Sequence, residues 1–584
     1  MSKIAIDYFR MKMIDLKDLE KKFIPTADDE KFQYNPFIIK NLQKYQPIYS
    51  LFFEMTEKNH SEINLKHRYN IINTNEVFDI SFNKTIEKPV FIKYSPLYDP
   101  IKYLIGKYNT DSDSNFYNLP TINSNVSNCH KKLLNTNNSS YIDGFFCFLS
   151  SQILNTNEFI HGIDYYGSYL GIQDKFKMNI YDDYEYLSNS TFFNNSIHKL
   201  FDINKNETVS QYMNLNSRRN KFKLNISSSS VIDNDIIMIE SISCNDPQTI
   251  DESDNNLQNI KMIYQKENEN SDKNSESSSS CEEYTTDDEE NTDVDNDFDE
   301  DDEINTDEDE NEVVNSDKDE EESNEEESDE EEMNAYINDF PIQMICLEKC
   351  DGTLDELFEN KILGEQESIA AMFQIIMILI TYQKAFHFTH NDLHTNNIMY
   401  IKTDIENIYY KYNKEIYCIP TYGRIYKIID FGRSIYKFNG NLFCSDSFAP
   451  GGDASTQYNF EPYYDDKKPI ILPNYSFDLC RLGTSIFDFL FDIDKIIPVN
   501  TMSAFQKLIY NWCIDDFDKN ILYKRNGEER YPNFKLYKMI ARTVHKHLPE
   551  KQLNLPIFKD FKISKKKTIN CKNIIDIDQI PCYA

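Results

Sequence analysis

The chain has 584 residues, too many for one ordinary hydrophobic core, so its length predicts two lobes or a catalytic domain with insertions. The formal net charge of −37 is unevenly spread, because residues 282–332 contain 31 Asp or Glu and one Lys, which leaves −7 for the rest of the chain. An acidic run of this density repels nucleic-acid phosphates and argues against nucleic acid as a partner.

The compartment is indicated by the cysteines and by the apolar runs. Twelve cysteines without a C-x-x-C pair indicate free thiols. The first residues carry charges at short intervals and lack the apolar core of a signal peptide. The longest apolar run, IIMILI within 370–380, is too short to cross a bilayer. We therefore expect an intracellular protein in a reducing compartment, with no membrane partner.

The first third of the chain predicts three elements after an irregular start. Residues 1–80 have no clear hydrophobic period and are interpreted as an N-terminal extension. Residues 88–97, KPVFIKYSPL, predict an apolar strand with a single lysine, Lys93. A helix with an apolar stripe is predicted from Tyr141, and the aromatic and glycine mixture of 159–172 predicts a strand with a bend.

A long insertion is predicted at residues 173–340. Its part 245–333 is almost free of apolar residues, so it cannot bury enough surface to offset the entropy lost on ordering. We expect this acidic part to be disordered. Its charge density suggests that it recruits basic proteins as substrates or partners.

Ordered elements resume after the insertion. Residues 344–347 predict a buried strand, 350–352 a turn, and the apolar residues from Leu354 a short helix. Apolar residues recur at helical spacing through 369–380, which predicts a long amphipathic helix.

Two polar motifs then alternate with apolar elements. The octet HNDLHTNN leads into a predicted strand at 398–401, and a further strand, RIYKIID at 424–430, runs into the sequence DFG. Residues 478–490, DLCRLGTSIFDFL, predict a second buried helix.

These motifs carry the residue types that phosphoryl transfer needs. HNDLHTNN fits H-x-D-L-x-x-x-N, with Asp392 and Asn397 five residues apart, and the second motif supplies Asp430, Phe431 and Gly432 at the end of a strand. Phosphoryl transfer requires magnesium ligands, a cation on the phosphates and a carboxylate that orients the attacking hydroxyl. In this order the motifs resemble the catalytic loop and the magnesium loop of the protein-kinase superfamily.

The resemblance covers about residues 88–551, without the acidic part, and implies an α+β, bilobal fold. A small β-rich lobe would occupy 81–348, including the insertion, and a larger, mainly helical lobe would occupy 349–584. The resemblance also implies ATP and Mg²⁺ as cofactors and a protein substrate.

The resemblance implies four catalytic roles. Asp392 would accept the proton of the attacking hydroxyl, and Asn397 and Asp430 would bind magnesium. Lys93 would pair with the phosphates of the nucleotide.

The remaining implied roles concern adenine and the support of the loop. Backbone groups of Glu348 and Cys350 would form the hinge that holds the adenine. The residues with an implied structural role are His390, Phe431, Gly432 and Asp478, the last of which would brace the backbone of the catalytic loop.

Two departures from the family pattern affect the nucleotide. No glycine precedes Gly106, so no glycine-rich loop covers the phosphates ahead of Lys93, and we expect weak nucleotide affinity. The only acid in the predicted helix from Tyr141 is Asp143, which either pairs with Lys93 as an ATP-site residue or leaves that lysine without its partner.

Two further departures affect regulation and substrate. Asn391 replaces the arginine of H-R-D, which predicts activity that does not depend on phosphorylation of the activation loop. His394 stands where serine/threonine protein kinases carry lysine. The same pattern occurs in haspin-type protein kinases and in aminoglycoside and choline kinase-like enzymes, so the loop alone does not choose between protein and small-molecule substrates.

Within the superfamily the chain is most similar to the serine/threonine protein kinases of giant DNA viruses related to mimivirus, on the segments VFIKYSP and FDLCRLGTSIFDF and on its Asn- and Tyr-rich composition. That similarity implies a viral source, with the host cytoplasm or the virion as location. The favoured function is a serine/threonine-protein kinase. A small-molecule phosphotransferase and a weakly catalytic pseudokinase scaffold remain open.

Overall fold

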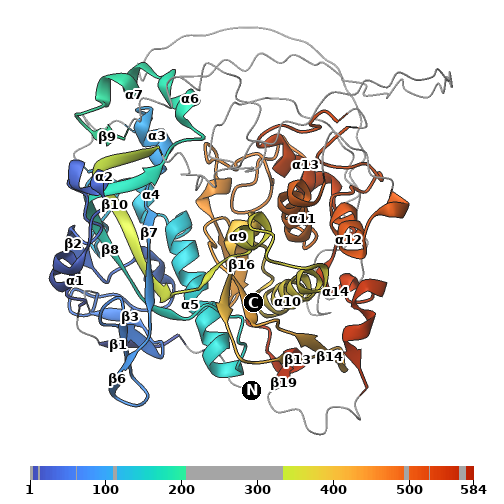
Figure 1. The fold of residues 1–584 in the computed structure, drawn as a ribbon. Coiled ribbons are helices and arrows are strands. Elements are labelled where there is room, and N and C mark those ends of the chain that lie inside the picture. Colours follow the sequence, from blue (N-terminus) through green and yellow to red (C-terminus); the bar gives the residue numbers. More distant parts are fainter. Residues whose placement is uncertain are drawn as a thin grey trace, which may run out of the picture. The chain divides into compact units, whose positions relative to one another are not determined.

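The computed structural model describes residues 4, 6–10, 13–60, 62–108, 115–204, 333–491, 499–524, 527–564 and 574–584. These residues form a mixture of helices and several β-sheets, in agreement with the predicted α+β class (Figure 1). The predicted acidic segment lies outside the described residues except for Met333, which is buried directly before a strand. Its expected disorder therefore stays a prediction.

Lys93 lies in a five-stranded antiparallel sheet (Figure 1). The strand order is β2-β8-β10-β7, and β9 pairs with the beginning of β10. The strands are β2 (Ile39–Gln43), β7 (Val90–Pro96), β8 (Tyr165–Asn179), β9 (Phe201–Ile203) and β10 (Asn334–Glu348). The register places Lys93 opposite Ile345 of β10. The strand predicted around Lys93 is confirmed.

The bounds of two strands differ from the prediction. The strand predicted at 159–172 begins only at Tyr165 and continues to Asn179, so the predicted insertion starts inside β8. After Gln173, polar residues of β8 flank Phe176 and Met178, and the backbone pairs with β10 from Asn334 to Phe340, which extends both strands. Between β8 and β9 the chain forms α6 (Tyr184–Ser188) and α7 (Thr191–Ser196).

The first 80 residues are part of this fold. β2 pairs with β8 at the edge of the sheet, and Phe32 stacks on Tyr336 of β10 with ring centroids 4.6 Å apart. The other elements of this segment and of the residues up to β7 are α1 (Leu16–Lys22), α2 (Ala27–Lys31), β1 (Tyr8–Arg10), β3 (Ile63–Leu65), β4 (Tyr69–Ile71), β5 (Glu76–Asp79) and β6 (Lys84–Glu87). A sequence without hydrophobic period thus forms short elements, of which β2 joins the sheet by pairing with a strand far along the chain.

The helix predicted from Tyr141 is α5 (Ser139–Asn157), which contacts β8 and β10 (Figure 1). Its N-terminus is capped by Asn138, whose side chain accepts a hydrogen bond from the Ser140 amide, and it ends at Glu158 in a left-handed conformation. Two short helices precede it, α3 (Pro100–Leu104) and α4 (Lys131–Leu134).

The long helix that precedes the polar octet is α10 (Glu365–Phe386), and the prediction that it is amphipathic is wrong. Every residue from Ser368 to Gln383 is buried, because neighbouring elements cover all sides of the helix. By length and composition α10 could cross a bilayer, unlike the short run expected from the sequence, but 94% of its apolar window is buried inside the fold. Its composition is that of a core helix.

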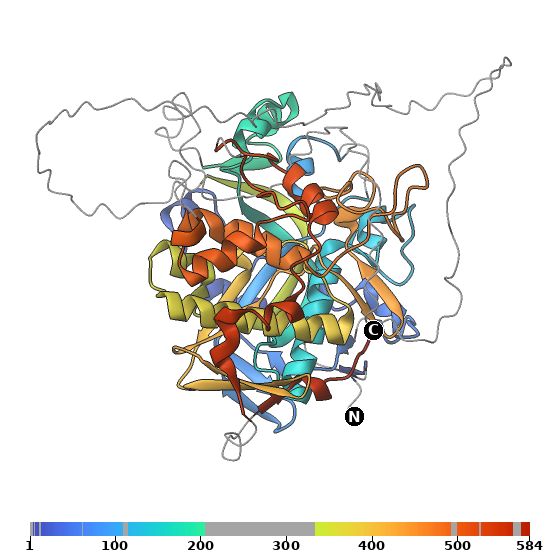
Figure 2. The same cartoon turned by 90° about the vertical axis from the view of Figure 1, so that its right-hand side faces the viewer.

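Small sheets surround the polar motifs. The predicted strands at 398–401 and 424–430 are β12 (Ile398–Lys402) and β15 (Arg424–Ile428), which pair with each other, while β11 (Gly352–Thr353) pairs with β12. The C-terminal segment returns to the hairpin of β13 (Asn407–Tyr412) and β14 (Glu415–Pro420), as Figure 2 shows. Its strands are β18 (Lys562–Ile563) and β19 (Ile574–Asp576), and a separate hairpin joins β16 (Ile435–Phe438) and β17 (Asn441–Cys444).

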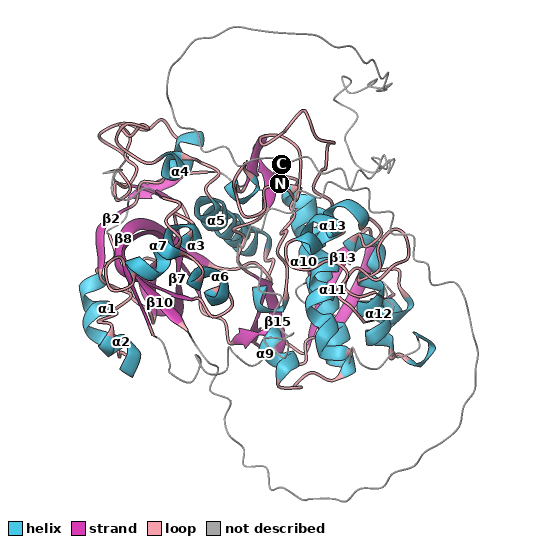
Figure 3. Ribbon diagram, turned by 90° about the horizontal axis from the view of Figure 1, so that it is seen from above, coloured by secondary structure: helices cyan, strands magenta, loops and turns pink. Residues whose placement is uncertain are grey.

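The helices after the DFG motif pack around α11 (Phe477–Leu490), which confirms the second predicted buried helix. Figure 3 shows α11 beside α12 (Ala504–Trp512) and α13 (Lys535–Thr543), and both contact it. The short helix α9 (Leu354–Glu359) is confirmed too, and α14 (Pro549–Gln552) contacts α10.

Candidate active site

The octet lies in a loop that joins α10 to β12, and a side chain of α11 holds the backbone of this loop. His387 ends α10 in a left-handed conformation, with φ of 49°. The fully buried carboxylate of Asp478 accepts hydrogen bonds from the backbone amides of His390 and Asn391, at 2.9 Å each. Burial raises the pKa of Asp478, and the two amides stabilise its charged form. Asp478 therefore braces the loop backbone, in the position expected for a structural residue.

His390 uses both ring nitrogens inside the loop. Its Nδ1 accepts a hydrogen bond from the Asp392 amide at 3.3 Å, so its Nε2 carries the proton and donates to the Ile429 carbonyl at 2.9 Å. The side chain is fully buried. These contacts suit a structural role and leave the imidazole no lone pair for a metal ion.

The lysine of β7 contacts two carboxylates from distant segments. Lys93 Nζ lies 2.6 Å from Asp143 Oδ2 and 2.8 Å from Asp430 Oδ1. Burial lowers the pKa of Lys93, but the charges of Asp143 and Asp430 outweigh burial and raise it above the ordinary value. In turn Lys93 lowers the pKa of Asp430 against the effect of burial. The structure thus brings together three of the predicted site residues.

The two residues after Asp430 are placed by α5. The Phe431 amide donates a hydrogen bond to Asp143 Oδ1 at 2.9 Å, and the Phe431 ring is fully buried, 4.6 Å from the ring of Phe146 on α5. A Cβ added at Gly432 would lie 3.5 Å from Asp430 Oδ1, an ordinary contact distance. Phe431 therefore anchors the DFG turn in the interior while Asp430 keeps 48% of its side chain exposed.

Asn397 is oriented by its own loop. Its amide nitrogen donates to the Asp392 carbonyl at 2.9 Å and lies 3.1 Å from His394 Nε2. Burial lowers the pKa of His394 to about 4, so the imidazole is neutral near pH 7 and its Nε2 accepts from the amide. His394 therefore does not supply the positive charge that a lysine at this position would supply.

The carboxylate of Asp392 is surrounded by groups that the sequence did not point to. Arg433 Nη1 lies 3.6 Å from Asp392 Oδ2, and Tyr537 Oη donates to Asp392 Oδ1 at 2.5 Å. Burial raises the pKa of Asp392, but the charge of Arg433 and the hydrogen bond from Tyr537 contribute to holding it well below its usual range. Arg433 directly follows the DFG motif and could have been predicted from that position. Tyr537 lies in no recognisable motif and could not.

At the predicted hinge the side chain of Glu348 has a structural contact. Its Oε1 accepts from Lys427 Nζ at 2.5 Å and from the Asp164 amide at 2.8 Å. For the backbone N–H of Cys350, no hydrogen-bond acceptor is found in the described part of the chain. Burial raises the pKa of the Cys350 thiol to about 12. This backbone N–H, which has no acceptor among the described residues and lies beside a neutral thiol, suits the predicted contact with the adenine of a nucleotide.

The described residues contain no cluster of three or more His, Cys, Asp or Glu that would hold a metal ion unaided. Magnesium is usually bound through one or two protein oxygens together with the phosphates of its substrate. The exposed Asp430 carboxylate and the amide oxygen of Asn397, whose nitrogen is engaged by the loop, fit this donor set. The two residues therefore suit a magnesium ion that arrives with a nucleotide.

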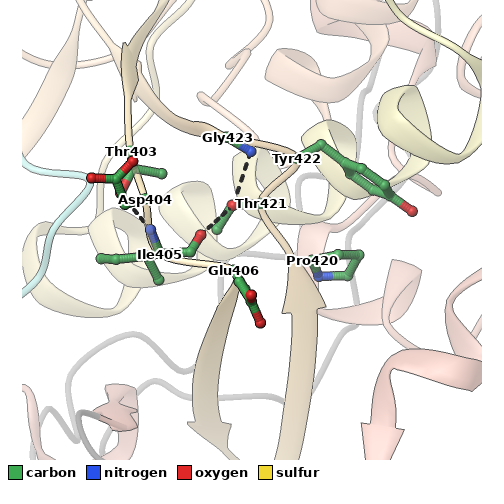
Figure 4. Close-up of a pocket in the computed structure, with 8 residues that line it drawn as sticks. All are labelled: Thr403, Asp404, Ile405, Glu406, Pro420, Thr421, Tyr422 and Gly423. Carbon is green, nitrogen blue, oxygen red and sulfur yellow. Dashed lines mark hydrogen bonds between the residues drawn. The ribbon is translucent and has the colours of Figure 1, made fainter.

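A pocket of about 270 Å³ lies elsewhere, between the ends of β12, β13, β14 and β15 (Figure 4). Its walls are formed by residues 403–406 and 420–423, none of which was predicted as a site residue. Thr421, one of the lining residues, donates a hydrogen bond to the Ile405 carbonyl. None of the lining residues is among the carboxylates that contact Lys93.

Comparison with known proteins supports the protein-kinase superfamily as the class of this chain. The relatives found include the serine/threonine-protein kinase haspin of Mus musculus and of Bos taurus, each 32% identical over 126 residues. Each match covers 20% of this chain and 16% of the relative. No family model matches the chain.

Proposed function

We propose that this chain is an ATP- and Mg²⁺-dependent protein kinase that phosphorylates serine or threonine hydroxyls. The observation that carries the proposal is the contact of Lys93 with both Asp143 and Asp430. A cation joined to a helix carboxylate and placed beside an exposed carboxylate is the arrangement required to hold phosphates next to a magnesium ligand.

The proposed roles follow from the contacts of each residue. Lys93 binds the phosphates, and Asn397 and Asp430 hold magnesium, which neutralises charge on the phosphate oxygens. Asp392, ionised because its pKa is lowered, orients the acceptor hydroxyl and takes its proton. The Cys350 amide and the Glu348 carbonyl contact the adenine.

We further propose a bilobal arrangement. The small lobe comprises the five-stranded sheet and α5, and therefore includes β2 from the first 80 residues. The large lobe comprises residues 349–584. None of the nine cysteines in the described part of the chain forms a disulfide, which supports action in a reducing, intracellular compartment.

A labelled-ATP assay tests the function. Purified protein is incubated with Mg²⁺ and labelled ATP, alone and with a basic protein, beside Asp392→Ala and the matched control Asp404→Ala, an exposed aspartate of the pocket in Figure 4. Loss of a general base costs about 10² to 10⁴ in rate. We expect that loss for Asp392→Ala only, and equal signals from all three proteins would overturn the proposal.

The second candidate is a small-molecule phosphotransferase, which the neutral His394 in the catalytic loop favours. Choline and an aminoglycoside added to the same assay distinguish the two. Transfer to either one, with none to protein, would replace the protein-kinase proposal. ATP binding without transfer to any acceptor would indicate a pseudokinase scaffold.

The acidic segment has a separate test. We propose that residues 245–333 attract basic substrates, because of their charge density. Their deletion should reduce phosphorylation of a basic protein at low salt, should leave that of an acidic one unchanged, and should have little effect at high salt. Unchanged rates with both substrates would reject the role.

A further inference from the structure

A buried tyrosine from a distant helix contacts the proposed catalytic base. Tyr537 on α13 is 1% exposed, and its Oη lies 2.5 Å from Asp392 Oδ1 and 2.7 Å from Arg481 Nε. Arg481 is on α11, three residues after Asp478. A guanidinium only donates hydrogen bonds, so the phenolic oxygen accepts from Arg481 and its single proton points to Asp392.

The tyrosine is held in this orientation by its surroundings. The guanidinium of Arg481 lies 5.1 Å from the centre of the Tyr537 ring, and the Phe534 ring stacks on it at 5.5 Å. Burial raises the pKa of the phenol, so the hydroxyl stays protonated and remains a donor. Hydrogen bonds are therefore donated in one direction, from Arg481 to Tyr537 and from Tyr537 to Asp392.

The two oxygens of Asp392 consequently differ. Oδ1 is taken by Tyr537, whereas Oδ2 faces Arg433 at 3.6 Å, beyond ordinary hydrogen-bond distance. The side chain is 24% exposed. One oxygen is thus held from inside the protein and the other remains for an acceptor hydroxyl.

We propose that Tyr537 is a positioning residue for phosphoryl transfer, which fixes the Asp392 carboxylate so that Oδ2 meets the acceptor hydroxyl. This inference rests on the proposed function. In the step it serves, the acceptor oxygen forms a bond to the γ-phosphorus, the bond from that phosphorus to the bridging oxygen breaks with its electron pair on ADP, and the acceptor proton passes to Oδ2.

Tyr537 is not placed as an acceptor itself. Its hydroxyl is buried and already bonded on both sides, by Arg481 and Asp392, so a phosphoryl group has no room to reach it. It supports the base from the side opposite to solvent. If Tyr537 instead competed with the substrate for Asp392, its hydroxyl would slow phosphoryl transfer, and Tyr537→Phe would be faster than the wild type.

The test compares Tyr537→Phe with Tyr523→Phe, a matched control in which a part-buried tyrosine donates to Asp488 Oδ1 at 2.9 Å. Turnover is measured at pH 7.5 over a range of ATP concentrations, so that kcat and KM are obtained separately. Loss of a hydrogen bond to a charged group corresponds to about a tenfold or larger change. We expect Tyr537→Phe to lower kcat by about tenfold or more, since the Asp392 carboxylate loses the hydrogen bond that orients it. KM for ATP and the control should change little.

Two further measurements separate positioning from a loss of fold. In an Asp392→Asn background, Tyr537→Phe should lower the residual rate no further. If Tyr537→Phe does not fold, Arg481→Gln, which leaves Tyr537 in place, should also lower kcat while KM for ATP stays unchanged. An unchanged kcat, faster turnover, or a further loss of rate in the Asp392→Asn background would overturn the positioning role. An inactive wild-type enzyme would overturn the proposed function instead.

Discussion

Lys93 pairs with Asp143 at 2.6 Å, although an aspartate has one methylene fewer than the glutamate that kinases use at this place. The neighbouring glycine explains how the short side chain reaches. A Cβ added at Gly144 would lie 2.4 Å from Nε2 of the buried Gln343 on β10, so the glycine leaves room for this amide between α5 and the sheet. We infer that the close packing of α5 at this glycine compensates for the missing methylene.

Gly144→Ala should therefore weaken nucleotide binding without touching a charged group. Gln343 is buried and donates a hydrogen bond to Gln46, which resists its displacement, so the added methyl group should move α5 away from β10 and lengthen the distance from Asp143 to Lys93. We expect a threefold to tenfold weaker Kd for ATP by calorimetry, about 0.6–1.4 kcal/mol. Gly364→Ala is the control, since a Cβ there would have 4.0 Å to its nearest atom. Equal Kd values for both variants would contradict this explanation.

Asp143→Asn tests how much the negative charge of Asp143 contributes to its pair with Lys93. The amide oxygen can still accept from the Phe431 backbone, which keeps the DFG turn anchored, but the ion pair to Lys93 is lost. A hydrogen bond between charged groups contributes about 1.5–3 kcal/mol, so we expect about 10- to 100-fold lower kcat/KM. A thermal melt checks that the fold is kept. Activity equal to wild type would show that Lys93 needs no helix carboxylate.

The site residues that could be predicted from the sequence are mainly those that lie in contiguous motifs. Asp392, Asn397 and Asp430 stand at set spacings beside strands that a hydrophobic pattern locates. Lys93 followed from the same pattern, and Asp143 from being the only acid in its helix. Each of these inferences needed only local information.

The parts that were missed depend on long-range contacts. Tyr537 reaches Asp392 across 145 residues, and neither its helix nor its neighbours carry a motif. β2 joins the sheet through backbone pairing with β8, which leaves no hydrophobic period in the sequence. The apolar stripe of α10 indicated a helix, but only the packed fold shows that its other faces are covered as well.

His394 should act through Asn397 and not through charge. Its neutral Nε2 accepts from the Asn397 amide, which orients the oxygen proposed to bind magnesium. His394→Ala removes the hydrogen-bond acceptor for Asn397. His394→Lys introduces the lysine of serine/threonine protein kinases, whose ammonium group cannot accept a hydrogen bond either. We expect both to raise the Mg²⁺ concentration for half-maximal activity by about two- to tenfold, the effect of one neutral hydrogen bond.

The control for this prediction is His394→Gln, whose side-chain oxygen can still accept from Asn397. It should stay closer to wild type than either of the other variants in the same magnesium titration. A lysine variant with normal or improved magnesium dependence would show that the position serves the phosphates and not Asn397.

Asp453 is expected to make loop phosphorylation unnecessary. Its carboxylate pairs with Arg433 Nη2, while Arg433 Nη1 faces Asp392, so a carboxylate already holds the arginine beside the base. Phosphatase treatment should leave activity unchanged. Asp453→Asn, which keeps a hydrogen-bond acceptor but loses the charge, should lower activity several-fold, unlike the exposed Asp466→Asn. An enzyme that loses all activity on complete dephosphorylation would contradict this prediction.

Two buried histidines should make the fold less stable in mild acid. Burial lowers the pKa of His67 to about 4 and that of His161 to about 3, from an ordinary value of 6.5. Below pH 6.5 the unfolded chain therefore binds protons that the folded chain does not, so stability falls as pH decreases towards the folded pKa values. At pH 5 each histidine costs about 2 kcal/mol relative to pH 7.5. Thermal melts at the two pH values measure the difference, and His161→Gln, which does not titrate, should reduce it by about 2 kcal/mol. Equal melting temperatures at pH 7.5 and pH 5 in the wild type would mean that these histidines become protonated in the folded state.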